Sequence, residues 1–209
     1  MKLDELSVRD FINELSSATA TPGGGSVAAL CGALGAALSV MVAGLTGGKE
    51  KFKDRWVSME GIKGRADRLR DHLLGLVQQD TDAYQKVVAA LRLPRDTEQQ
   101  RISRREALQA SLKKAAKVPL ETLRTSEGLM EIAKQVTEQG DPSAITDAGA
   151  AIYLAYTAGV IAAYNVRINL SQIEDEGFRL EYSREVEERL ARLRALFAEM
   201  ERYVSAQLR

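Results

Sequence analysis

The sequence predicts an all-α protein, a single-domain helical bundle. Its 209 residues include only 4 prolines and 5% aromatic residues, whereas alanine, leucine, arginine and glutamate, all good helix formers, are abundant. A hydrophobic content of 45% is enough for one sizeable core. No linker-like change in composition divides residues 1–209, so we expect one domain.

Three helices are expected in the first half of the chain. Residues 4–15 are amphipathic, and residues 26–46 form an uncharged helix that Gly47 and Gly48 end. A charged helix covers residues 49–91, with an interruption expected near Gly61 and Gly64.

Three more helices are expected in the second half. Pro94 forms a turn, and residues 97–139 then form a helix that Pro119 is expected to break or kink. A Gly-Asp-Pro signal precedes an Ala-rich helix over residues 143–173. We expect the two Ala/Gly-rich helices to lie at the centre of the bundle. The last helix, 180–208, has an apolar stripe made of Val186, Leu190, Leu193, Leu196, Phe197, Met200 and Val204.

Charge and metal-ligating residues exclude several classes of function. The 29 basic and 29 acidic residues balance, so no overall field favours nucleic acid or an anionic membrane. One cysteine, Cys31, allows no internal disulfide and is typical of a reducing compartment, here the cytoplasm. With His72 as the one histidine, a cysteine-based or histidine-rich metal site is excluded within one chain. The acidic, amphipathic N-terminus does not resemble a signal peptide.

A glycine-rich turn, Thr21-Pro-Gly-Gly-Gly-Ser26, precedes the uncharged helix. It matches the G-x-G-x-x-G/A pattern, but no apolar strand precedes it and no β-α-β alternation follows, which excludes a dinucleotide fingerprint. It lacks the Gly-Lys-Ser/Thr of a phosphate loop. Backbone N–H groups at such a helix start favour an anion or a carbonyl oxygen. A tight turn packed against a neighbour explains the glycines equally well.

The uncharged segment Val27–Leu45 is long enough for a membrane span. Its six alanines and three glycines favour membrane transfer weakly, and no aromatic belt flanks it. We therefore favour a core or interface helix. Its large side chains form one helical stripe, Leu30, Leu34, Leu38, Met41 and Leu45, and its small ones a second line, Cys31, Gly35 and Ser39.

Asp80 is the unusual carboxylate of the chain. It shares a helical face with Leu73, Leu76 and Val87, whereas Asp82 lies on the opposite, polar side. Burial raises a carboxyl pKa and suits it to proton transfer near neutral pH. The alternative is a structural aspartate that bonds to Tyr84 or to the end of a neighbouring helix.

The second Ala-rich helix carries polar residues at its two ends. Asp147 and Asn165 are five turns apart, about 27 Å, so they belong to different sites or meet across a dimer. Asn165 and Asn169 are neighbours on one face. Arg167 follows an apolar face and is expected to be buried, either in an inter-helix salt bridge or against the carboxylate of a ligand.

Four motifs resemble the formiminotransferase-cyclodeaminase C-terminal domain family, which includes methenyltetrahydrofolate cyclohydrolases. They occur in the family's order and cover nearly the whole chain. Thr146 departs from the serine expected before Asp147. The motifs are Thr21–Leu30 with Met41-Val42, Leu45-Thr46 and Lys49; Asp80-x-x-Ala83-Tyr84 with Arg92-Leu93-Pro94; Ser143–Gly149; and Asn165–Leu170.

The resemblance implies an all-α homodimer that binds a tetrahydrofolate in a groove at or near the subunit interface. Asp80 is then the acid/base residue, and no metal or cofactor beyond the folate is expected. The implied reaction is hydrolysis of 5,10-methenyltetrahydrofolate. The alternatives are formiminotetrahydrofolate cyclodeamination and, for a chain without activity, a silent helical dimer. The implied substrate-binding residues are Pro22, Gly23, Gly24, Gly25, Ser26, Lys49, Asp147, Asn165, Arg167 and Asn169.

Overall fold

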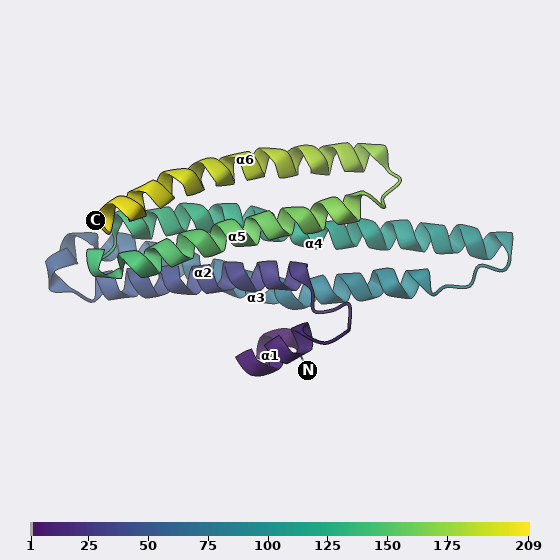
Figure 1. The fold of residues 1–209 in the computed structure, drawn as a ribbon, viewed down its shortest axis with the longest axis horizontal. Coiled ribbons are helices and arrows are strands. Elements are labelled where there is room, and N and C mark those ends of the chain that lie inside the picture. The colour runs from purple at the N-terminus through teal and green to yellow at the C-terminus, as the bar shows by residue number, and fades with distance from the viewer. Residues whose placement is uncertain (1) are drawn as a thin grey trace.

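The structure, a computed structural model, describes residues 2–209, and that range holds helices and turns but no strand. The all-α prediction is confirmed. An elongated bundle is formed by α2 (Gly24–Gly47), α3 (Trp56–Leu91), α4 (Glu98–Gln139) and α5 (Ile145–Leu170), which lie side by side (Figure 1). A last helix, α6 (Glu176–Gln207), packs on α4 and α5.

The N-terminal segment lies beside the bundle. The prediction of a single helix over residues 4–15 is wrong. A short 3-10 helix, η1 (Leu3–Glu5), is followed by α1 (Val8–Leu15). The break falls at Ser7, whose Oγ caps α1 by accepting from the Asp10 amide at 3.1 Å. The Leu3 amide donates to Gln78 Oε1 of α3 at 2.9 Å, which ties the segment to the bundle. Figure 1 shows α1 beside the four long helices rather than among them.

The prediction of one charged helix over residues 49–91 is wrong at its start, where the connection from α2 to α3 lies. Residues Glu50–Arg55 form a separate 3-10 helix, η2, and α3 begins at Trp56. The interruption expected near Gly61 and Gly64 is wrong, because α3 runs through both. Buried side chains on either side of them, such as Ile62, hold this stretch against the core, and a glycine in a helix costs only about 1 kcal/mol.

Helix α4 continues through Pro119. Thr97 begins the helix with a reciprocal capping box. Pro119 has no N–H, so the carbonyl of Ala115 loses its helical donor. Asn169 of α5 supplies a replacement, since its Nδ2 donates to Ala115 O at 3.3 Å. A contact between helices therefore compensates for the proline.

The C-terminal helices follow the predicted pattern with shifted starts. A 3-10 turn, η3 (Pro142–Ala144), leads into α5, and α6 begins at Glu176 because Asp175 caps it, accepting from Phe178 N at 3.0 Å. The apolar stripe of α6 faces the bundle, and its fully buried members are Val186, Leu190, Leu193 and Met200.

Helix α2 buries most of its small residues and leaves part of its large stripe exposed, although Leu30 and Leu38 pack partly against the core. A Cβ on Gly35 would lie 3.2 Å from the carbonyl oxygen of Ala151, so α2 and α5 pack with their backbones close. Leu34, Met41 and Leu45 remain 51%, 40% and 47% exposed. The small line of residues therefore makes the contact inside the chain, and much of the large stripe lies on the surface.

Two segments, Gly24–Gly47 and Pro142–Leu170, are long and apolar enough to cross a membrane by length and composition. In the structure 50% and 44% of their most apolar windows are buried. A core helix of a bundle passes the same test, so the pattern is weak evidence for a span.

Candidate active site

The candidate site forms where the first turn of α2 meets Asp80 of α3. A Cβ on Gly25 would lie 2.1 Å from Oδ1 of Asp80, closer than any side chain tolerates. The carboxylate therefore occupies the space that glycine leaves free. Ser26 donates from Oγ to Asp80 Oδ2 at 3.1 Å, and its Oγ lies 3.4 Å from Thr81 Oγ1.

Opposing influences act on the Asp80 carboxyl. Burial raises its pKa, while the hydroxyl and the backbone amide of Ser26 lower it, and the net effect is a raised pKa. Asp80 is half-buried, whereas Ser26 has no exposed surface. A carboxyl with these properties can take a proton from one group and return it to another.

One polar side chain of α5 lies at the same turn, and a second follows it one helical turn later. A Cβ on Gly24 would lie 3.4 Å from Nδ2 of Asn165, so α5 brings this amide against the turn. Asn165 Nδ2 donates to Ile161 O at 2.9 Å, and Asn169 Nδ2 donates to Asn165 O at 2.8 Å. These bonds engage both Nδ2 atoms and leave the two Oδ1 atoms as acceptors.

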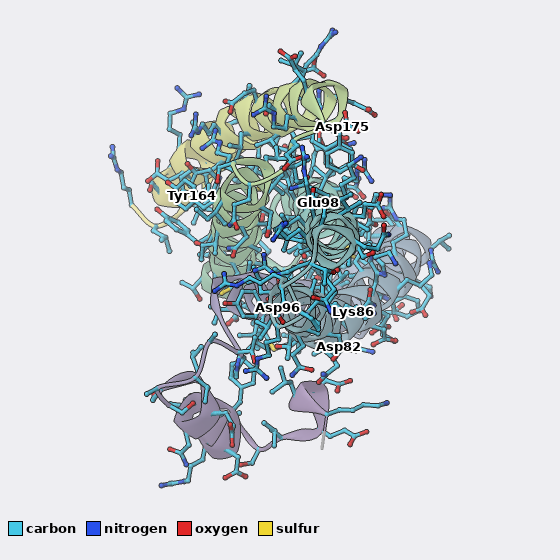
Figure 2. The ribbon with its side chains drawn as sticks, turned by 90° about the vertical axis from the view of Figure 1, so that its right-hand side faces the viewer. Asp82, Lys86, Asp96, Glu98, Tyr164 and Asp175 are labelled. Carbon is cyan, nitrogen blue, oxygen red and sulfur yellow. The ribbon has the colours of Figure 1, made fainter. Side chains whose placement is uncertain are left out.

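The remaining residues of the turn complete this end of the bundle. Gly23 is the N-cap residue of α2, and Pro22 before it is buried. Asp82, by contrast, is exposed and accepts from Gln78 Nε2 at 2.8 Å. Figure 2, viewed along the bundle, shows Asp82 on the outer side of α3, far from Tyr164 on α5.

Lys49 and Asp147 lie at the opposite end of the bundle. Lys49 follows the C-terminus of α2, and Asp147 lies in the first turn of α5. The 24 residues of α2 separate this end from Gly24 by about 35 Å. Within one chain these residues therefore do not join Asp80.

Arg167 lies in the last turn of α5, at the same end of the bundle as Asn165, and is not buried as expected. Its side chain is 40% exposed, and its Nη2 lies 2.5 Å from Glu187 Oε1 of α6. The inter-helix salt bridge is thus the alternative that the structure contains. An exposed pair of this kind stabilises a protein by about 0–1 kcal/mol.

The sequence interpretation missed Asp141. Its side chain is 1% exposed and pairs with Lys49, 92 residues earlier. The Gly-Asp-Pro signal was interpreted as a helix boundary, and the structure has the boundary between α4 and η3 at this place. Nothing in the local spacing indicates that the carboxylate also binds a lysine.

The family model of formiminotransferase-cyclodeaminase matches residues 7–188. The chain belongs to the formiminotransferase-cyclodeaminase family. The resemblance of its four motifs is thereby confirmed. Family membership follows from a match across most of the chain.

Individual members of the family differ in length and in name. Methenyltetrahydrofolate cyclohydrolase of Methylorubrum extorquens is 36% identical over 193 residues, 92% of this chain and 89% of that protein. Formimidoyltransferase-cyclodeaminase of Rattus norvegicus is 35% identical over 84% of this chain, which spans only 32% of that protein. The crystal structure of formiminotetrahydrofolate cyclodeaminase from Thermotoga maritima superposes with a TM-score of 0.89 at 29% identity, and each chain is covered completely.

Proposed function

We propose that this protein hydrolyses 5,10-methenyltetrahydrofolate to 10-formyltetrahydrofolate, with Asp80 as the acid/base residue. The observation that carries the proposal is the placement of Asp80, a partly buried carboxylate in a space left free by Gly25. The similarity to a cyclohydrolase of nearly the same length supports this reaction.

The chemistry needs one group that accepts and then returns a proton. Asp80 takes a proton from water as the oxygen bonds to the amidinium carbon between N5 and N10. The carbon–N5 bond then breaks, Asp80 protonates N5, and the hydroxyl proton leaves to solvent as the formyl carbonyl forms. The carbon is already electrophilic, so we propose no metal and no further cofactor.

The neighbouring side chains suit the pterin ring. The pterin presents N–H donors, and the Oδ1 atoms of Asn165 and Asn169 are acceptors held in place by bonds through Nδ2. The backbone of Gly23 and Gly24 forms the adjacent wall. Arg167 is left out of the site because it pairs with Glu187.

We also propose that two copies pair through α2 and α5. The outward stripe of α2 and the exposed Tyr164 and Ile168 of α5 leave apolar side chains in water. A second copy of the same chain covers them with the same surface, as a two-fold dimer requires. The two Ala/Gly-rich helices are then central in the dimer.

The register of this dimer brings the two ends of the bundle together. In a two-fold antiparallel pairing of α2, residues equally far from the midpoint of the Leu30–Leu45 stripe lie level with each other. Ser26 and Lys49 meet this condition. Lys49 and Asp147 of the second copy would therefore complete the site that contains Asp80.

The first experiment follows the absorbance of 5,10-methenyltetrahydrofolate with the purified protein against a protein-free blank. Asp80→Asn should reduce turnover to near the blank while the thermal unfolding midpoint is kept. Asp82→Asn is the matched control, since Asp82 is exposed, and it should keep wild-type turnover. Near-normal turnover of Asp80→Asn would falsify its role.

A second reaction, cyclodeamination of 5-formiminotetrahydrofolate, is favoured by the full-length superposition on a cyclodeaminase. The same proton transfers then close the ring and release ammonia. If the methenyl chromophore is lost no faster than in the blank, ammonia release from the formimino substrate is measured. Failure of both reactions, with folate still bound, would identify a silent helical dimer.

The dimer is tested by its mass in solution. Leu34→Arg places a charge on the outward stripe and should give a monomer with turnover reduced at least tenfold. Ile102→Arg is the matched control, because Ile102 is 44% exposed on α4 and is not part of the proposed α2–α5 surface. A Leu34→Arg protein that stays dimeric contradicts the proposed interface. We place the protein in the cytoplasm, where a single free cysteine is stable as a thiol.

A further inference from the structure

We propose that Asp141 is a positioning residue, which holds the ammonium of Lys49 for the reaction in the second copy's site. The proposal rests on the proposed function, and Lys49 is the group that acts on the substrate. It is carried by a buried carboxylate at the end of the bundle opposite Asp80.

Asp141 is built into the junction between α4 and α5. Its Oδ2 accepts from Lys49 Nζ, and its Oδ1 accepts from Ser143 N at 3.0 Å. Its own amide donates to Thr46 Oγ1 at 2.9 Å, so the last turn of α2 is attached to the same residue. Lys51 Nζ lies 3.7 Å from Oδ1. Both carboxylate oxygens of Asp141 therefore have hydrogen-bond partners that fix the orientation of the side chain.

Lys49 is held from its backbone as well. The Trp56 indole Nε1 donates to Lys49 O at 3.2 Å, and Phe52 N donates to the same oxygen at 2.9 Å. With Asp141 on Nζ, both ends of the lysine are fixed. A lysine of this type loses less rotamer freedom when it meets a substrate.

Exposure distinguishes this pair from an internal salt bridge. The Asp141 side chain is 1% exposed, whereas that of Lys49 is 43% exposed. The Lys49 ammonium holds the pKa of Asp141 well below its usual range, so the carboxylate is charged at neutral pH. An ammonium has three donors and Asp141 engages one, which leaves two for an oxygen outside the chain.

The oxygen in the proposed reaction is the one that water brings to the amidinium carbon. As the carbinolamine collapses to the formyl group, this oxygen loses its proton and gains negative charge. A fixed cationic donor stabilises that charge. Lys49 of the second copy lies level with Ser26 in the proposed dimer, on the side of the site where Asp80 removes the first proton.

The test is a double-mutant cycle with steady-state kinetics on 5,10-methenyltetrahydrofolate. Asp141→Asn keeps the shape of the side chain and removes its charge, and Lys49→Met removes the ammonium. Each should lower kcat by about 10- to 100-fold with KM within about threefold, since loss or misplacement of one such donor costs this much. The double variant should be no slower than Lys49→Met alone.

Lys51→Met is the matched control, because Lys51 approaches the same carboxylate and is 62% exposed; its kcat should stay within about threefold of wild type. Asp141→Asn with wild-type kcat overturns the proposal. So does a loss in the Lys49→Met background as large as in wild type, which would mean that Asp141 acts only on the fold. A wild-type protein that turns over neither folate refutes the proposed function itself, and with it this role for Lys49.

Discussion

Gly25→Ala is the sharpest test of how the fold places the candidate acid/base residue. The substitution adds one methyl group to the first turn of α2. At the present geometry its Cβ would lie 2.1 Å from Oδ1, 2.5 Å from Cγ and 2.6 Å from Oδ2 of Asp80. The whole carboxylate must therefore move by rotation about the Cα–Cβ bond of Asp80, since rotation about Cβ–Cγ leaves the close contact to Cγ in place.

The size of the displacement follows from these distances. An ordinary contact begins at 3.4 Å, and the difference from 2.1 Å is about 1.3 Å of movement for Oδ1. A shift of this size breaks the 3.1 Å bond from Ser26 Oγ. A misplacement of about 1 Å in a catalytic group costs on the order of 100-fold in rate. Alanine also favours the helix by up to about 1 kcal/mol, which offsets part of the strain.

The assay combines initial rates of methenyl-chromophore loss with thermal unfolding. Gly25→Ala should lose about 100-fold in kcat/KM, while its unfolding free energy changes by about 1 kcal/mol or less. Gly61→Ala is the matched control, because no atom lies within 4 Å of its Cβ. It should keep full activity and gain up to about 1 kcal/mol in stability.

One result would refute the reasoning. A folded Gly25→Ala protein with the same kcat/KM as wild type and Gly61→Ala would mean that the position of Asp80 is not set by the empty space at Gly25.

Three further substitutions separate site residues from structural ones. Ser26→Ala removes a hydrogen bond that lowers the Asp80 pKa, so that pKa should rise further. Because the ionised carboxylate is the base, the acid limb of the plot of kcat/KM against pH should move to higher pH. An acid limb that does not move argues against Asp80 as the base. Asn169→Leu leaves the carbonyl of Ala115 without its hydrogen-bond donor and should lower the free energy of unfolding by about 1–3 kcal/mol, measured by denaturant titration. An unchanged denaturation midpoint would show that water replaces the amide. Arg167→Gln should lower stability by about 0.2–1 kcal/mol and leave kcat/KM within about twofold, and a large loss of turnover would return Arg167 to the site.

Local pattern was sufficient for the helices and for the choice between two aspartates. Helical spacing put Asp80 in line with Leu73 and Leu76, both of which are buried, and put Asp82 on the polar side, where the structure leaves it exposed. The start of α2 was predicted two residues late, because Gly24 and Gly25 were assigned to the turn although they begin the helix.

The inward face of α2 could not be predicted from its sequence. The helix is apolar on every side, so periodicity does not indicate which stripe meets the bundle. The deciding feature is steric: Gly35 lets the backbone of α5 approach, and a stripe of leucines at the same place would hold it away. Of the large side chains, Leu34, Met41 and Leu45 stay largely on the surface.

Contacts between segments far apart in the sequence could not be predicted, for a different reason. Lys49 and Asp141 are 92 residues apart, and Asn169 reaches a carbonyl that is free only because Pro119 follows it by four residues. Neither pairing has a local spacing to indicate it. Arg167 misled the sequence interpretation in the opposite way, since its apolar neighbours suggested burial although Glu187 of α6 meets it at the surface.

The two glycines at the start of α2 explain why this turn looks like a phosphate loop without being one. Each leaves room for one side chain from another helix: Gly25 for Asp80 of α3, and Gly24 for Asn165 of α5. The first turn of a helix also presents unpaired N–H groups and a positive dipole end, which stabilise a nearby carboxylate. Burial acts against this, and its effect on the Asp80 pKa is the larger. The same turn that would attract a phosphate therefore holds the protein's own carboxylate, and the balance of the two influences fits that carboxylate to exchange protons.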